Sequence, residues 1–123
     1  MAKVRLGVFL FLLFILDFAK LESMETMNLR DQIQPHAQQA AALLKAIAHE
    51  ERLLILCALA QGEKSAGDLW QQSTLSQSAF SQHLAVLRKE QLVTVRKEAQ
   101  TVFYSLDHPI VLQLLRVLRQ SLC

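Results

Sequence analysis

Residues 65–106 read SAGDLWQQSTLSQSAFSQHLAVLRKEQLVTVRKEAQTVFYSL. The pattern predicts a short helix over 66–72 and a longer helix that begins near Ser76. In the longer helix the apolar side chains recur every three or four residues, which is typical of a face turned toward a core. The residues of that face are Phe80, Leu84 and Leu87. Two helices separated by so brief a turn predict a helix-turn-helix.

Two short runs after the longer helix alternate between apolar and polar residues. They are LVTVRK at 92–97 and TVFYSL at 101–106. Alternation with a period of two is typical of a strand with one buried face, so the pair predicts a hairpin. Lys97 and Gln100 are expected near its tip, where a basic wing would reach toward a nucleic-acid backbone.

Three further helices are expected outside this stretch. They span about 33–48, 50–60 and 109–122. The first opens near Pro35, and the second ends before Gly62. The second is so continuously apolar that we expect it to be buried on most sides. The sequence therefore predicts a mainly α domain over 33–123 with one small β-hairpin wing, which is a winged helix-turn-helix.

Polar side chains dominate the face of the longer helix that points away from the core. An α-helix fits the major groove of DNA, where short polar groups can hydrogen-bond to base edges. The candidate base-reading residues are Gln77, Ser78, Ser81, Gln82 and His83. Further DNA-binding candidates, on the end of this helix and on the wing, are Arg88, Arg96, Lys97 and Gln100. An ordinary surface helix is the alternative, and His83 could instead be a half-buried histidine.

The composition limits the other function classes. The chain has 123 residues and a formal net charge of only +2, so charge alone is weak support for a nucleic-acid partner. No Ser-His-Asp set, glycine-rich phosphate loop, paired carboxylates or Cys-x-x-Cys is visible in the sequence. The chain is therefore not expected to be an enzyme, and no cofactor is expected. A winged-helix module that binds a protein instead of DNA is an alternative, which the basic wing disfavours.

Residues 1–26 are interpreted as a separate N-terminal extension, because residues 6–16 read LGVFLFLLFIL and carry no charge. This run is shorter than the roughly 20 residues that cross a bilayer. Three interpretations stay open: translation begins at Met24 or Met27, the segment associates with a membrane, or it is a cleaved export signal. Export disagrees with a DNA-binding pattern downstream, so a cytoplasmic location is expected.

Three segments resemble the ArsR/SmtB family of winged-helix repressors, and within it the dithiol HlyU/BigR/SqrR/YgaV-like subgroup. They are LLKAIAHEERLLILCAL at 43–59, LSQSAFSQHLAVLRKEQLV at 75–93 and RKEAQTVFYSL at 96–106. The resemblance implies five helices with a hairpin before the last, and a homodimer formed through the first and last helices. It also implies binding to double-stranded DNA at an imperfect palindrome in a promoter, as a repressor or an anti-silencer.

Members of this family often bind metals, but the expected ligand patterns are missing here. The segment that would carry Cys-x-Cys, at 65–72, has no cysteine, and Asp107 and His108 are adjacent rather than spaced. The other histidines show no metal-ligand spacing. No metal site is therefore expected, although a metal-responsive regulator is kept as an alternative.

The two cysteines are Cys57, in the helix expected over 50–60, and Cys123, the last residue. Taken alone, Cys57 is typical of a small core residue and Cys123 of a free terminal thiol. The resemblance to the dithiol subgroup implies instead a redox-sensing pair, which a persulfide, polysulfide or other oxidant links so that DNA binding weakens. The link could form within or between subunits. A DNA-binding regulator without a thiol switch is the alternative.

Overall fold

The computed structural model describes residues 7–13 and 28–123, and the chain divides into two compact units, Met1–Gln38 and Gln39–Cys123. In the first unit, residues 7–13 are helical and exposed. None of the described helices is both long and apolar enough to span a membrane. The candidate starts at Met24 and Met27 lie outside the described residues.

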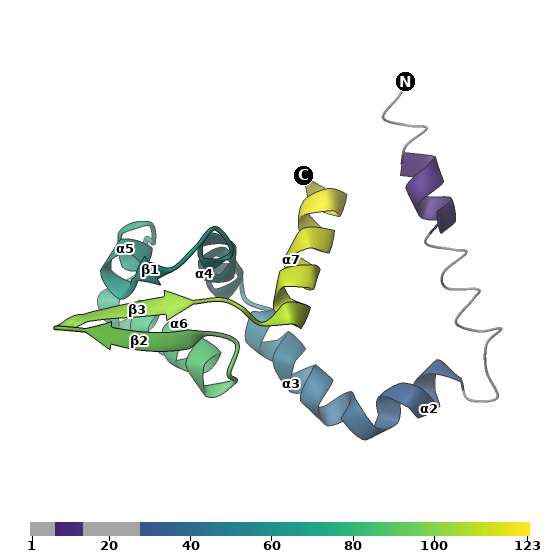
Figure 1. Ribbon diagram of the computed structural model, residues 1–123, viewed down its shortest axis with the longest axis horizontal. Coiled ribbons are helices and arrows are strands. Elements are labelled where there is room, and N and C mark those ends of the chain that lie inside the picture. Colours follow the sequence, from purple (N-terminus) through teal and green to yellow (C-terminus); the bar gives the residue numbers. More distant parts are fainter. Residues whose placement is uncertain (1–6, 14–27) are drawn as a thin grey trace. The chain divides into compact units, whose positions relative to one another are not determined.

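The helix predicted over 33–48 begins earlier than expected and is interrupted. The elements of this region are helix α2 (Leu29–Ile33), the 3-10 turn η1 (Gln34–His36) and helix α3 (Ala37–Ile47) (Figure 1). Asn28 caps α2, because its side chain accepts a hydrogen bond of 3.0 Å from the backbone N–H of Asp31. Pro35 lies in the 3-10 turn, since proline has no N–H with which to continue an α-helical ladder.

The remaining predicted elements are present in the predicted order. They are helices α4 (Glu50–Ala60), α5 (Ala66–Gln71) and α6 (Gln77–Lys89), strands β2 (Thr94–Glu98) and β3 (Thr101–Ser105), and helix α7 (Pro109–Leu122). The mainly α fold with one small antiparallel hairpin is therefore confirmed (Figure 1).

The hairpin belongs to a sheet with one more strand than the sequence predicted. Strand β1 (Lys64–Ser65) pairs antiparallel with β3, and the strand order is β1-β3-β2. Two residues are too few to show an alternating pattern, so only the long-range pairing reveals this strand. Ala99 and Gln100 form the turn between β2 and β3, and Ala99 has a φ of +55°, as a tight hairpin turn requires.

Both ends of α6 are fixed by local hydrogen bonds. At the start, the Ser76 side chain accepts a bond of 3.2 Å from the backbone N–H of Ala79. At the end, Gln91 has a φ of +59°, and the backbone N–H of Leu92 donates to the carbonyl of Leu87 at 3.0 Å. A residue with positive φ and this bond are typical of a Schellman termination. The helix is therefore held at a defined length and start.

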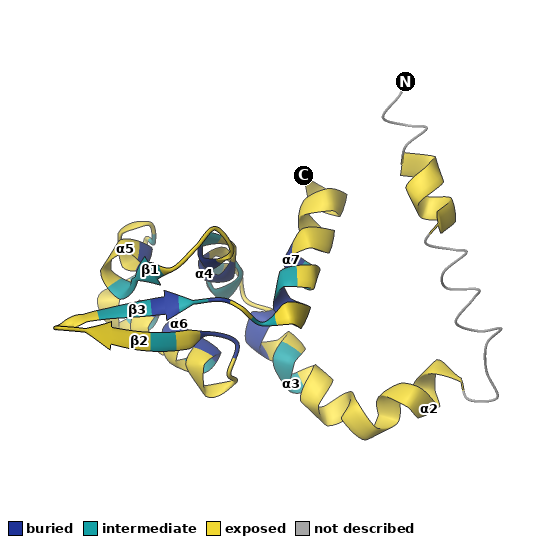
Figure 2. Cartoon of the chain, in the orientation of Figure 1, coloured by how far each residue is buried: buried dark blue, intermediate teal, exposed yellow. Residues whose placement is uncertain are grey.

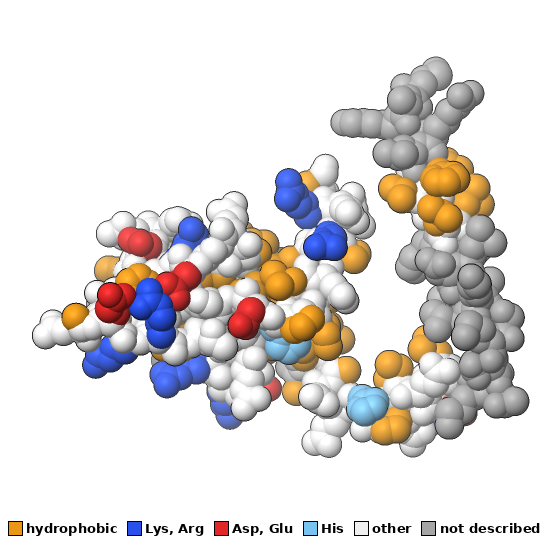
Figure 3. Space-filling model, viewed as in Figure 1, with side chains coloured by type: hydrophobic (Ala, Val, Ile, Leu, Met, Phe, Trp, Pro, Cys, Tyr) orange, Lys and Arg blue, Asp and Glu red, His pale blue; other side chains and the backbone are white. Residues whose placement is uncertain are grey.

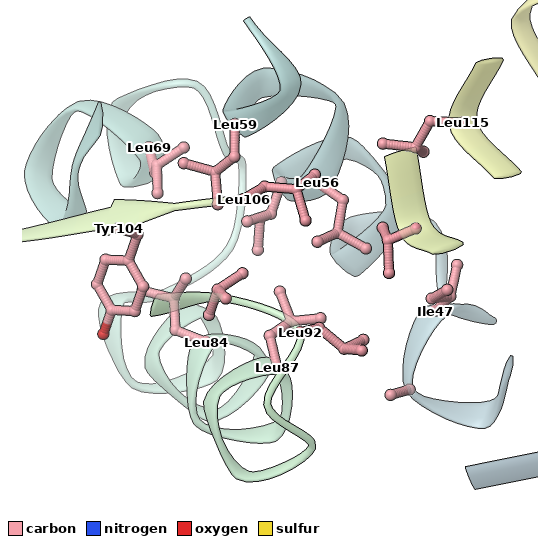
Figure 4. Packing of buried hydrophobic residues seen from close by; sticks show 14 of the residues in the cluster. Ile47, Leu56, Leu59, Leu69, Leu84, Leu87, Leu92, Tyr104, Leu106 and Leu115 are labelled. Atoms are coloured by element: carbon pink, nitrogen blue, oxygen red, sulfur yellow. The ribbon is translucent and has the colours of Figure 1, made fainter. Parts of the chain in front are cut away.

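One apolar core holds the second unit together (Figures 2 and 4). Its least exposed large side chains are Leu56, Leu59, Leu87, Leu92 and Val111. Figure 4 shows the cluster running from Tyr104 and Leu84 near the sheet to Ile47 and Leu115. The predicted inward stripe of α6 is buried as expected. Burying each large apolar side chain contributes about 1.5–3 kcal/mol, which fixes the scaffold beneath the exposed face of α6.

One expectation about this core is wrong. Helix α4 is not buried on most sides, because Leu54 is 57% exposed and Cys57 is also exposed. Only Ile55, Leu56 and Leu59 are buried, since these positions form the one stripe that faces the core. The continuous apolar run therefore serves one buried face and leaves another at the surface.

Candidate nucleic-acid interface and thiol pair

The polar face of α6 is exposed, and its side chains make no hydrogen bonds within the described part of the chain. The side chains that form it are Gln77, Ser78, Ser81 and Gln82, all at the surface. Within the described part of the chain, none of these four side chains makes a hydrogen bond to another protein group. Short, unengaged donors and acceptors on one helix face are the groups that direct readout of base edges requires.

His83 is the fifth candidate base-reading residue, and its ring contacts other side chains of the protein. It is half-buried, and its Nδ1 lies 3.2 Å from the guanidinium Nη1 of Arg52. Its ring centroid lies 4.2 Å from that of His49. Burial lowers the pKa of His83, and the nearby His49 and Arg52 lower it further. The geometry agrees with the half-buried alternative for His83.

Basic groups without an internal carboxylate partner adjoin the polar face. Arg88 and Lys89 lie in the last turn of α6, and Lys97 lies on β2. All three are exposed, and the described residues contain no ion pair with any of them. On the face shown in Figure 3, basic side chains line the edge below the hairpin, whereas acidic side chains lie beside a basic one on the hairpin itself. This edge has the charge that attracts phosphates.

Arg96 differs from these residues because acidic groups already bind it. It donates two hydrogen bonds to Glu63, at 2.8 and 2.7 Å, and one to Glu98 at 2.8 Å. Its guanidinium also lies 4.3 Å above the ring centroid of Phe103. The hydrogen bond from Arg96 lowers the pKa of the Glu63 carboxyl, and the hydroxyl of Ser105, which donates to it at 3.1 Å, does the same. The bidentate pair ties β2 to the segment before β1.

Both cysteines are free and exposed. The interpretation of Cys57 as a core residue is therefore wrong. Partial burial raises the pKa of the Cys57 thiol, and the negative charge of the Cys123 thiolate raises it further. The two thiols lie on different helices, Cys57 in the middle of α4 and Cys123 at the end of α7.

Cys57 also lines a pocket of about 260 Å³ beside α4. Its walls are formed by Glu51, Leu54, Ile55, Cys57, Ala58, Gln61, Leu69, Gln72 and Phe80. A small solute can reach the Cys57 sulfur through this pocket.

The described residues hold no group of three or more histidine, cysteine or acidic side chains that could bind a metal ion.

Comparison with known proteins gives one consistent result. Residues 49–95 match the family model described as bacterial regulatory protein, arsR family. The transcriptional activator HlyU of Vibrio cholerae is 48% identical over 97 residues, which cover 79% of this chain and 89% of the relative. The regulator YgaV of Escherichia coli K12 is 45% identical over 93 residues, which cover 75% of this chain and 94% of the relative.

A solved structure agrees with the sequence matches. The transcriptional repressor BigR from Xylella fastidiosa superposes with a TM-score of 0.70 at 36% identity, covering 76% of this chain and 96% of that structure. The names of these relatives describe regulators of transcription and no enzyme. One is called an activator and one a repressor, so the direction of regulation varies among them.

Proposed function

Since the chain belongs to the ArsR family of bacterial regulatory proteins, we propose that it is a DNA-binding transcriptional regulator that acts as a homodimer in the cytoplasm. The observation that carries this proposal is the face of α6, where four polar side chains point outward with no internal partner. Water solvates such groups in the free chain, and in a recognition helix they are available to hydrogen-bond to base edges.

Helix α6 enters the major groove in this proposal, and the hairpin contacts the adjacent backbone. Gln77, Ser78, Ser81 and Gln82 read base edges, whereas Arg88, Lys97 and Gln100 approach phosphates. A two-fold dimer presents two copies of α6, so its operator is an imperfect palindrome in a promoter.

The proposed dimer uses α3 and α7. Both helices leave large apolar side chains at the surface of the single chain: Leu44 on α3 is 52% exposed, and Val117 on α7 is 56% exposed. The final turns of α7 are exposed throughout (Figure 2). Apolar side chains on neighbouring helices are stabilised when a second copy removes them from water.

The proposal includes a thiol switch at Cys57 and Cys123. One thiolate attacks a sulfane sulfur of a polysulfide, which forms a cysteine persulfide and releases a chain shorter by one sulfur. The other thiolate then attacks the cysteine sulfur of that persulfide, so a disulfide forms and hydrosulfide leaves. The thiols are oxidised by two electrons, and the transferred sulfur is reduced to sulfide. The exposure of both sulfurs supports this step.

The link would act by restraining α7 relative to α4. Because α7 contributes to the proposed dimer, the restraint changes how the two copies of α6 are spaced. A coupling of about 1–3 kcal/mol between thiol state and DNA binding is sufficient for a useful switch. A regulator of the same fold without any thiol switch is the competing possibility.

The test is fluorescence anisotropy with DNA from the promoter upstream of the chain's own gene, using reduced and polysulfide-treated protein. We expect tight binding when reduced, and a loss of about tenfold or more after treatment that a reductant reverses. Cys57→Ser and Cys123→Ser should each bind like reduced protein and stay bound after treatment.

A Cys57→Ser protein that still loses affinity normally would rule out the switch but leave DNA binding in place. Binding that is insensitive to salt would contradict DNA recognition itself, because phosphate contacts release counterions.

The raised pKa of Cys57 adds a second expectation. The rate of the reaction with polysulfide should increase as the pH rises, because only the thiolate attacks.

A further inference from the structure

Arg52, in the first turn of α4, connects three helices through polar contacts. Its Nε donates to the carbonyl of Ala46 at 2.6 Å, and its Nη2 donates to the carbonyl of Lys45 at 3.2 Å. Both carbonyls lie at the end of α3, where the last turn of a helix lacks internal donors. Its Nη1 lies 3.2 Å from Nδ1 of His83, in the middle of α6. A single guanidinium therefore joins the end of α3 to the candidate recognition helix.

The contact with Arg52 determines the protonation state of His83. A guanidinium only donates hydrogen bonds, so Nδ1 of His83 must accept, and the ring must be neutral with its proton on Nε2. His49 lies beside this ring, and its Nδ1 accepts from the backbone N–H of Glu51 at 3.1 Å and caps α4. Protonation of His83 at Nδ1 would place an N–H opposite an N–H of Arg52.

We propose that Arg52 and His83 form a pH-sensitive strut that positions α6 against the end of α3, so that acidification loosens the recognition helix and weakens DNA binding. Both are positioning residues. The inference rests on the proposed function, in which α6 reads DNA and α3 takes part in the dimer. It assigns His83 to the support of the reading face and leaves the reading to the four exposed polar residues.

The surroundings of His83 favour its neutral form. Burial is the largest cause of its lowered pKa, the charges of His49 and Arg52 act in the same direction, and Glu51 opposes them. Because the pKa in the folded protein lies below that of the unfolded chain, the unfolded chain takes up the proton first as the pH falls. The stability that the neutral ring provides is thus present above about pH 6.5 and is lost as the pH falls toward the folded-state pKa.

The first test measures DNA affinity of the full chain at about pH 7.5 and about pH 5.5, the range in which histidines titrate. Wild type should lose about tenfold or more, although added positive charge by itself would strengthen binding to phosphates. His83→Asn keeps an acceptor near the Nδ1 position and cannot be protonated, so it should bind normally at the higher pH and lose less than about threefold. His36→Asn, which removes an exposed histidine on η1, is the control and should behave like wild type.

The second test needs no DNA and follows the histidine ring protons by NMR. The pKa of His83 should lie below its ordinary value in wild type and move upward in Arg52→Gln, because this change removes a positive charge and the guanidinium that faces Nδ1. Equal acid sensitivity of wild type and His83→Asn would overturn the strut while DNA binding stands. A His83 pKa that does not respond to Arg52→Gln would also overturn it. Absence of DNA binding at any pH would contradict the proposed function and leave the NMR titration to decide on the strut.

Discussion

The exposed face of α6 and the β2–β3 hairpin are both candidates for contact with DNA, yet they differ in how their side chains are engaged. On α6, the polar groups and Arg88 make no internal contact with a charged partner among the described residues. On the hairpin, Arg96 is bound by Glu63 and Glu98 and lies over Phe103. Arg96 is exposed like the α6 side chains, but it is already paired within the protein and they are not.

This difference indicates that an exposed charged side chain can already be paired within the protein, and so is not free to bind a phosphate. Releasing Arg96 for a phosphate would require breaking its bidentate pair with Glu63, so a new contact gains little. Lys97 is the neighbouring basic residue with no such partner among the described residues. We therefore expect α6 to carry specificity, Lys97 to carry the backbone contact of the wing, and Arg96 to hold the wing in place.

The largest expected effect comes from placing a negative charge on the α6 face. Ser81→Asp should weaken operator binding by roughly 100-fold or more, because it removes a base contact and repels nearby phosphates in both half-sites. Anisotropy titrations with operator DNA measure the loss. Gln61→Glu adds the same charge at an exposed position just after α4, outside the proposed DNA and dimer surfaces, and should leave the affinity within about threefold. An equal loss in both variants would mean that the effect is general repulsion and not loss of a contact on α6.

A smaller effect should separate the two basic residues of the wing. Lys97→Ala should reduce the salt dependence of binding by about two counterions per dimer, one for each lost phosphate contact. Arg96→Ala should leave that slope unchanged, because the side chain is already neutralised within the protein. The measurement is the slope of log affinity against log salt concentration. If both substitutions flatten the slope equally, Arg96 leaves its carboxylates when DNA binds, and the proposed contrast between the two residues fails.

The smallest effect concerns the acid sensitivity of the wing. The pKa of Glu63 is lowered in the folded protein, so its pairing with Arg96 stabilises the fold above the ordinary carboxyl pKa and is lost as the pH falls through the folded value. Glu63→Gln should therefore be slightly less stable than wild type near neutral pH, with the difference vanishing in acid. Urea unfolding at a series of pH values measures this. Glu90→Gln, at an exposed carboxylate with no ion pair among the described residues, should show no such trend; a matching trend would show that the Arg96 pair is not its cause.

Helix positions were predictable from the sequence because their signals are local. Ser65 and Ser76 precede apolar residues at helical spacing, and each caps the helix that follows it. The hairpin was likewise predicted from apolar and polar residues that alternate over two short runs. In contrast, β1 and the role of Glu63 were missed, because Glu63 meets Arg96 across 33 positions of sequence. No local pattern marks a carboxylate that will pair at such a separation.

The sequence by itself determined the helix-turn-helix, the hairpin and the candidate reading face, since each depends on periodicity and capping within a few residues. The tertiary structure decided which of those side chains are free. It placed His83 beside Arg52, paired Arg96 with Glu63 and left Cys57 at the surface. Whether a polar group is available depends on the partners that folding brings beside it, and those partners come from distant parts of the chain.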